Sequence, residues 1–167
     1  MSSIIYLDKK NLAFKDLVLS TPGGENIVRC FACGACSAAC PVREIDERYN
    51  PRRIIRMVLL GMKDEVLRSD FVWLCASCYT CTERCPQDVH LTTIMRVLKN
   101  IAVSEGIIHP AYQTQVETIR KHGKIYEIED FDNKKRGRLG LPPLEKQNLD
   151  MARIFNMTGR AKKEPTD

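Results

Sequence analysis

The cysteines of this 167-residue chain follow one repeated spacing, C-x2-C-x2-C-x3-C with a proline after the last cysteine. The second copy begins 45 residues after the first, and together the two copies use all eight cysteines. The copies are Cys30, Cys33, Cys36, Cys40 with Pro41, and Cys75, Cys78, Cys81, Cys85 with Pro86. Proline fixes φ and has no N–H donor, so each run should end in a turn. Any fold for this chain must therefore support two short thiol-rich loops.

This spacing resembles the bacterial ferredoxin run, which holds [4Fe–4S] clusters through cysteine thiolates. Three thiolates at i, i+3 and i+6 can reach three irons of one cubane, and the fourth iron needs a ligand from elsewhere. In two-cluster ferredoxins the fourth cysteine of each run serves the other cluster. The resemblance therefore implies two ligand sets: Cys30, Cys33, Cys36 and Cys85 for cluster 1, and Cys75, Cys78, Cys81 and Cys40 for cluster 2.

With eight thiolates for eight irons, no iron is left open to bind a substrate, which predicts electron transfer and not catalysis at the clusters. The chain has no G-x-G-x-x-G and no P-loop, so no second cofactor site is expected. His90 lies close to the second run, but the full cysteine count makes a histidine ligand unnecessary.

Two other uses of cysteine compete with iron–sulfur clusters. A disulfide framework suits secreted proteins, yet residues 1–10 lack the basic start and apolar run of a signal peptide. Structural zinc also binds C-x2-C pairs, although zinc sites usually combine two such pairs and do not use a triple followed by C-P. A zinc-stapled interaction module is therefore the alternative from a different functional class.

The net charge of +5 is modest and its basic residues are scattered, with no motif that reads DNA or RNA. We expect no nucleic-acid partner. The longest uncharged apolar stretch is far below the ~18–20 residues that span a bilayer. We therefore expect no membrane span, and the labile clusters predict a reducing cytoplasmic location.

Helical periodicity dominates the rest of the chain. Asn50 and Pro51 form a helix start, and Ile55, Val58, Leu59, Met62 and Val66 then share one apolar face. A second amphipathic helix carries Leu91, Ile94, Met95, Leu98, Ile101 and Ala102, and a third runs from Pro110 to Gly123. Strand-like alternation is limited to residues 124–131. The predicted fold is all-α, with a two-cluster domain and an extended C-terminal arm.

The sequence predicts three regions. Residues 1–28 form an N-terminal docking segment. Within it, a short helix or strand carries Leu12, Phe14, Leu17, Val18 and Leu19, and Pro22-Gly23-Gly24 breaks that element. Residues 29–123 form the two-cluster domain. Residues 124–167 form an extended tail that binds a partner, because its scattered leucines and methionines are more apolar than disordered chain usually is.

Three segments resemble the C subunit of heterodisulfide reductase, a small protein with the α-helical ferredoxin fold. They read RCFACGACSAACPV (29–42), NPRRIIRMVLLG (50–61) and WLCASCYTCTERCPQDV (73–89). The resemblance implies a non-catalytic component of a larger hetero-oligomer. It would relay electrons from a flavin-containing A subunit to the B subunit, which reduces the coenzyme M–coenzyme B heterodisulfide in methanogenesis. The B subunit uses adjacent cysteines, and this chain has no Cys-Cys pair.

Two redox alternatives accompany this interpretation. Relatives of the C subunit also serve heterodisulfide-reductase-like complexes of sulfur metabolism. Iron–sulfur subunits of other flavin-dependent dehydrogenases carry similar runs, although they usually combine them with the catalytic cysteine motifs that are missing here.

Overall fold

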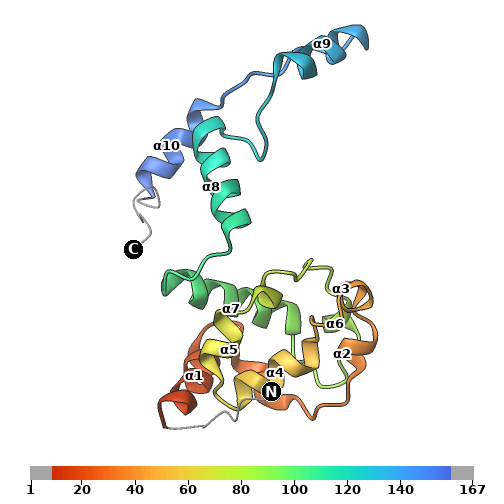
Figure 1. The fold of residues 1–167 in the computed structure, drawn as a ribbon, viewed down its shortest axis with the longest axis vertical. Helices are drawn as coiled ribbons and strands as arrows, with labels where there is room; N and C mark the ends of the chain where they lie inside the picture. Colours follow the sequence, from red (N-terminus) through yellow and green to blue (C-terminus); the bar gives the residue numbers. More distant parts are fainter. Residues whose placement is uncertain (1–8, 159–167) are drawn as a thin grey trace, which may run out of the picture. The chain divides into compact units, whose positions relative to one another are not determined.

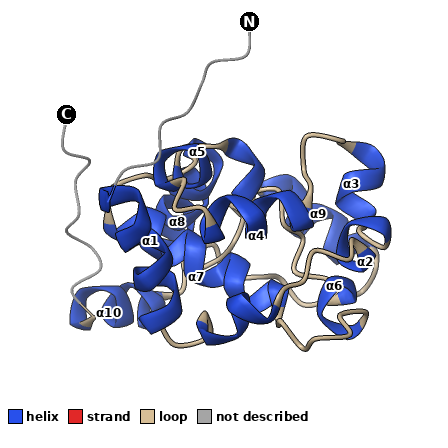
Figure 2. Cartoon of the chain, turned by 90° about the horizontal axis from the view of Figure 1, so that it is seen from below, coloured by secondary structure: helices blue, strands red, loops and turns tan. Residues whose placement is uncertain are grey.

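The structure is a computed structural model that describes residues 9–158. The chain divides into two units between Ile107 and Ile108, and each unit is described by itself. Every regular element within residues 9–158 is a helix and none is a strand (Figures 1 and 2), which confirms the all-α prediction. None of the helices in this range is long and apolar enough to cross a membrane.

The first unit is built from short helices around two longer ones. Its elements are α1 (Lys9–Ser20), η1 (Glu25–Arg29), α2 (Ala35–Ala38), α3 (Pro41–Ile45), α4 (Pro51–Leu59), α5 (Lys63–Leu67), η2 (Asp70–Val72), α6 (Thr80–Glu83) and α7 (Leu91–Ser104). α1, α4, α5 and α7 pack together, whereas α2, α3 and α6 gather at the other end of this unit (Figures 1 and 2).

Helix α4 begins where the sequence predicts. The Asn50 side chain caps it by accepting a hydrogen bond from the Arg53 N–H, and Pro51 occupies its first turn. Ile55 and Val58 are fully buried on its inner face. Gly61 has a left-handed backbone, with φ +73°, and separates α4 from α5.

Helix α7 is the main support of this unit. Its six predicted core residues are all buried, with Leu98 completely inaccessible. Burial of one such leucine or isoleucine stabilises a fold by about 1.5–3 kcal/mol. The helix ends at Ser104 with Glu105 as its C-cap, and Gly106 follows with φ +77°, as expected after a helix.

Residues 9–28 pack within the first unit and do not form a separate segment there. Phe14 and Val18 lie four residues apart on one face of α1, and both are buried, as is Ile27 in η1. α1 contacts both α4 and α7. The eight residues that precede α1 in the predicted docking segment lie outside the described residues.

The second unit contains α8 (Pro110–His122), α9 (Asp130–Arg138) and α10 (Leu149–Met157). α8 begins and ends as predicted, with Gly123 at φ +68°. α8 packs against α10, and the Asn148 N–H donates to the His122 carbonyl at 3.0 Å. The structure therefore groups α8 with the tail, whereas the sequence boundary at 123 separated them.

Residues 124–129 lack the strand that their alternation suggested, since no described strand lies beside them to complete a ladder. The polar end of the tail, residues 159–167, lies outside the described residues.

Gly24 allows the chain to turn sharply between α1 and η1. A Cβ atom at this buried position would lie 1.9 Å from the Val18 carbonyl oxygen. Backbone cannot move aside as a flexible side chain can, so Gly24→Ala should destabilise the protein by at least about 1–3 kcal/mol. Gly137→Ala is the matched control, because a Cβ at Gly137 in α9 meets nothing within 4 Å. Thermal unfolding followed by circular dichroism measures the difference, and equal midpoints for the two variants would refute this account of the turn.

Candidate metal centre

The first cysteine run forms a tight loop between η1 and α2. Cys30 follows the last residue of η1, and the backbone then takes left-handed conformations at Ala32 (φ +62°) and Gly34 (φ +87°). These two positions curl the loop so that α2 can begin at Ala35. Cys33, at the middle of the loop, is exposed, and the other three cysteines of the run are partly buried.

The second run repeats this backbone with a shift of 45 residues. Ser77 (φ +53°) and Tyr79 (φ +63°) match Ala32 and Gly34, and α6 matches α2 residue for residue. Left-handed backbone costs a residue with a side chain about 1–2 kcal/mol. In the second loop both left-handed residues, Ser77 and Tyr79, carry side chains and are therefore strained. The strain indicates that placing the cysteines requires this loop shape. Cys78 is exposed, as is its counterpart Cys33.

One cavity brings together cysteines from both runs. Cys30, Cys33 and Cys36 line it together with Cys85, which lies 49 residues beyond Cys36. The remaining walls are mostly apolar, and Arg52 of α4 is their one charged side chain. The fourth cysteine of the second run therefore faces the first three cysteines of the first run.

The other four cysteines lie around Cys81. Its thiol is close enough to those of Cys75, Cys78 and Cys40 for all three to influence its ionisation. Burial raises the pKa of the Tyr49 hydroxyl, and the nearby thiols of Cys75, Cys40 and Cys81 add to the rise. Cys40, the fourth cysteine of the first run, is therefore close to the second run.

Burial and crowding affect the ionisation of two of the thiols. Burial raises the pKa of the Cys36 thiol, and nearby Cys30 and Cys81 add to the rise. Burial likewise raises the pKa of Cys81. Crowded, buried thiols resist ionisation in an empty site, whereas coordination to a metal removes their protons outright.

All eight cysteines are free thiols. Among the described residues, no three Cys, His, Asp or Glu side chains are gathered around the position of a single ion. A cubane instead offers a separate iron to each of its four thiolates. Four thiols lining one mostly apolar cavity therefore fit a [4Fe–4S] cluster.

Each loop is attached to the first turn of a following helix by a hydroxyl group. Ser37 in α2 accepts from the Arg52 N–H of α4 at 2.9 Å and donates to Asn50 Oδ1 at 2.7 Å. Thr82 in α6 stands 45 residues later and accepts from the Thr92 N–H of α7 at 3.3 Å. These contacts connect the thiol loops to the helices that form the core.

Basic side chains surround the loops. The Arg43 guanidinium donates to the Ser37 carbonyl at 3.2 Å, and Lys99 Nζ donates to the Cys75 carbonyl at 3.4 Å. The Arg96 guanidinium lies 5.9 Å from the centre of the Tyr79 ring. Such positive charges offset part of the negative charge that thiolate clusters carry.

Some of these residues could be found from the sequence and others could not. Arg43 lies close to the first run in the sequence, and exposed Arg29 and Arg84 are each next to a cysteine, so the motif itself points to them. Arg52 and Lys99 are distant in sequence from the cysteines that they lie near in the structure. Tyr49, Ser37 and Thr92 carried no signal in the cysteine pattern, although the 45-residue repeat does align Ser37 with Thr82.

His90 is not among the residues that line the cavity. It is the residue before α7, and its imidazole pairs with Asp88 at 2.9 Å.

Comparison with known proteins agrees with this geometry. Residues 26–89 match the family described as "4Fe-4S dicluster domain". The iron–sulfur C 2 subunit of the "CoB--CoM heterodisulfide reductase" from Methanocaldococcus jannaschii is 37% identical over 147 residues, covering 84% of this chain and 78% of that protein.

Two further relatives carry related names. The C subunit of the "H(2):CoB-CoM heterodisulfide,ferredoxin reductase" from Methanothermobacter thermautotrophicus is 33% identical, covering 75% of this chain and 68% of its own length. The C subunit of the "Ferredoxin:CoB-CoM heterodisulfide reductase" from Methanosarcina mazei is 35% identical, covering 72% and 74%. Together with the eight clustered cysteines, the matches establish a protein with two [4Fe–4S] clusters and an iron–sulfur electron-transfer role.

Asn50 connects the first loop to the core by accepting from both the Ser37 hydroxyl and the Arg53 N–H. Asn50→Ala removes both acceptor contacts and should lower the free energy of unfolding by about 1–2 kcal/mol. Asn50→Asp keeps an acceptor at the same place and should retain most of the stability. Denaturant unfolding measures both variants, and an aspartate variant as unstable as the alanine variant would contradict this role.

Proposed function

The chain belongs to the family of heterodisulfide reductase C subunits, and on that premise we propose that it is the electron relay of such a complex. Electrons would enter from a flavin-containing A subunit. They would leave to the B subunit, which reduces the coenzyme M–coenzyme B heterodisulfide. The chain itself is a non-catalytic part of this oxidoreductase. The observation that carries the proposal is the pairing of two four-thiol groups, each with one exposed thiol.

The proposed ligands are those of the crossed arrangement. Cys30, Cys33, Cys36 and Cys85 hold cluster 1, and Cys75, Cys78, Cys81 and Cys40 hold cluster 2. The shared cavity supports the first set. The electrostatic influence of Cys40, Cys75 and Cys78 on Cys81 supports the second.

The two clusters are placed to exchange electrons with each other. α2 packs against α6, and Cys36 and Cys81 are close enough to influence each other electrostatically. When bound, each [4Fe–4S] cluster accepts and gives up single electrons. The chain holds both in one compact unit, so the transfer between them needs no diffusion.

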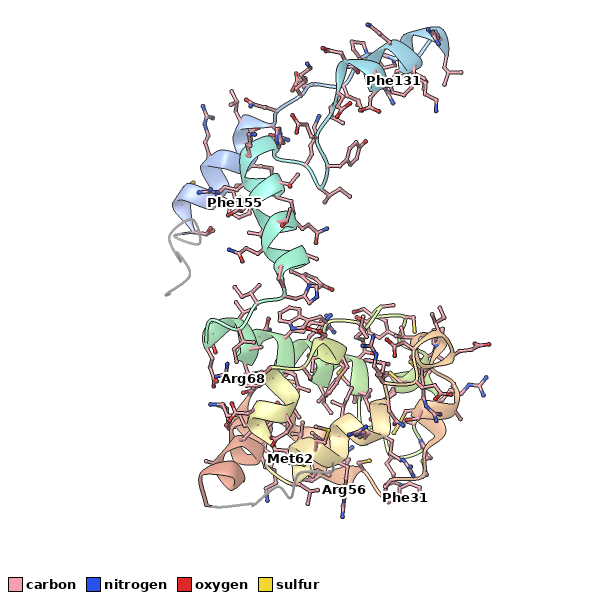
Figure 3. All side chains as sticks on the ribbon, in the orientation of Figure 1. Phe31, Arg56, Met62, Arg68, Phe131 and Phe155 are labelled. Carbon is pink, nitrogen blue, oxygen red and sulfur yellow. The ribbon has the colours of Figure 1, made fainter. Side chains whose placement is uncertain are left out.

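Each cluster also has its own exposed edge. Beside exposed Cys33, the Phe31 ring is 61% accessible and projects from the surface of the first unit (Figure 3). Beside exposed Cys78, Tyr79 is 43% accessible. Two exposed edges with apolar rims suit a relay, because one partner can dock at each.

The second unit supports membership of a larger assembly. Among its described residues, Ile128 is the buried apolar side chain, while many others are exposed. The exposed ones are Ile108, Val116, Ile125, Tyr126, Phe131, Leu139, Leu141, Leu149, Ile154 and Met157. Apolar surface of this extent is typical of a protein that binds partners.

The names of the relatives favour methanogenic chemistry over the sulfur-metabolism alternative. The three named above all refer to the CoB–CoM heterodisulfide.

The crossed ligand sets predict that distant cysteines affect the same cluster. Cys36→Ser and Cys85→Ser should both damage the same cluster, cluster 1. In each variant a serine hydroxyl replaces a thiolate that binds iron. Cys81→Ser should damage the other. Electron paramagnetic resonance of the reduced protein distinguishes the two signals, and loss of different signals from Cys36→Ser and Cys85→Ser would exclude the crossed arrangement.

The proposed complex predicts what accompanies the chain in its native host. Anaerobic affinity purification of the full chain should recover a large flavoprotein and a protein with adjacent-cysteine motifs. Removal of residues 108–167, the whole second unit, should leave iron and sulfide per chain unchanged while at least about tenfold less of these partners is recovered. Recovery of a different dehydrogenase would contradict the proposed complex, and undiminished recovery without the second unit would contradict its docking role.

A further inference from the structure

Thr92 points a hydroxyl group at the second set of thiols. It is the second residue of α7 and only 1% of it is accessible to solvent. Its Oγ1 lies 3.4 Å from Cys81 Sγ, within hydrogen-bonding distance for sulfur. Because the residue is buried, no bulk water competes for this contact.

The direction of the hydrogen bond follows from the neighbouring groups. The Thr82 hydroxyl donates to Thr92 Oγ1 at 3.1 Å, and Thr82 Oγ1 accepts from the Thr92 N–H. The one hydroxyl proton of Thr92 is therefore free for Cys81. A thiolate bound to iron has no proton of its own, so Thr92 must be the donor and Cys81 the acceptor.

Tyr49 supplies a second donor to the same set of thiols. Only 2% of this tyrosine is accessible, and its hydroxyl lies close enough to the Cys75 thiol to interact with it. Toward a bound Cys75 thiolate, which has no proton, the Tyr49 hydroxyl can act only as the donor. Two buried hydroxyl groups from different parts of the chain therefore lie near two sulfurs of one proposed cluster.

The first loop has only a longer hydroxyl–thiol contact at this place. Ser37 occupies the position of Thr82 in the repeat, but its proton goes to Asn50 Oδ1 at 2.7 Å, and Cys36 Sγ is 4.0 Å away. Where α7 has Thr92 in its first turn, α4 has Arg52, which donates to the Ala32 carbonyl and lines the cavity of the first set. The two sets therefore have different surroundings within the same repeated backbone.

We propose that Thr92 and Tyr49 set the reduction potential of the cluster held by Cys75, Cys78, Cys81 and Cys40. Reduction adds one negative charge to the cluster and its thiolates, and hydrogen bonds to the sulfurs stabilise that added charge. The two residues position protons and do not bind iron. This inference rests on the ligand sets proposed above.

The test uses the full chain with both clusters reconstituted, titrated anaerobically while electron paramagnetic resonance follows each cluster. Thr92→Val keeps the shape of the side chain and removes the donor. At a fixed potential, the ratio of reduced to oxidised cluster should fall about tenfold, which is about 59 mV for a one-electron couple. Tyr49→Phe should act in the same direction on the same signal, with the other signal shifted less than about twofold.

Controls separate loss of the donor from general disturbance. Thr92→Ser keeps the hydroxyl and should keep the parental potential. Thr114→Val on exposed α8 and Tyr126→Phe in the second unit make the same chemical changes elsewhere and should shift neither signal. An unchanged potential in Thr92→Val, or an equal shift in Thr92→Ser, would overturn the proposal.

The assignment of signals distinguishes failure of this inference from failure of the proposed ligand sets or of the proposed complex. Cys81→Ser identifies the signal of its own cluster. A shift of that signal in Thr92→Val supports the inference, and a shift of only the other signal overturns it. Iron and sulfide contents show separately whether both clusters are present, and partner recovery plays no part in the titration.

Discussion

The convergence of two cysteine loops is the constraint on which the rest of this structure depends. Each loop needs left-handed backbone at two positions, and three of the four residues there carry side chains. Neither loop has a regular hydrogen-bond ladder to hold its shape. Support comes instead from the Ser37 and Thr82 hydroxyls, which accept backbone N–H groups from the first turns of α4 and α7. The loops are therefore as rigid as the helices beneath them.

This dependence explains why the core consists of α1, α4, α5 and α7. α4 and α7 each bury one apolar face in the core, and this packing fixes where their N-terminal turns lie. Cys40 precedes the N-cap of α4 by ten residues, whereas Cys85 precedes that of α7 by five. Helix α3 lies within the longer connection. The repeat therefore relates the two cysteine loops and the starts of α4 and α7. The connections between each loop and its helix differ in length.

The sequence revealed the parts of the fold that depend on spacing and periodicity. The cysteine runs predicted the cofactor, and the apolar faces predicted the start of α4 and most of α7. The face predicted from Ile55 to Val66 runs past the end of α4 at Leu59 and into α5, because the chain turns at Gly61. The buried face of α1 was not recognised, because Phe14 and Val18 alone do not define a helical period. The boundary before α8, between Ile107 and Ile108, was missed for a different reason: the contacts of α8 with α10 join residues far apart in sequence.

Site residues outside the cysteine motifs were hidden for a related physical reason. Tyr49 lies between α3 and α4, where nothing in its neighbours indicates an approach to Cys75. Thr92 is one of several polar residues in an amphipathic helix, and its significance appears only once Thr82 is seen to donate to it. A hydrogen bond to sulfur depends on where one hydroxyl group lies and which way its proton points. The order of residue types along the chain does not show either.

The arrangement separates groups that hold and tune the clusters from groups that a partner could touch. Thr92, Tyr49 and Ser37 are buried, so the binding of another protein to the surface does not have to disturb their hydrogen bonds. Phe31, Cys33, Tyr79 and Cys78 are exposed. An electron carrier benefits from this division, because its internal environment must stay constant while its edges are covered and uncovered. The repeated loop supplies both features, since the same turn that exposes its middle cysteine directs the later cysteines inward.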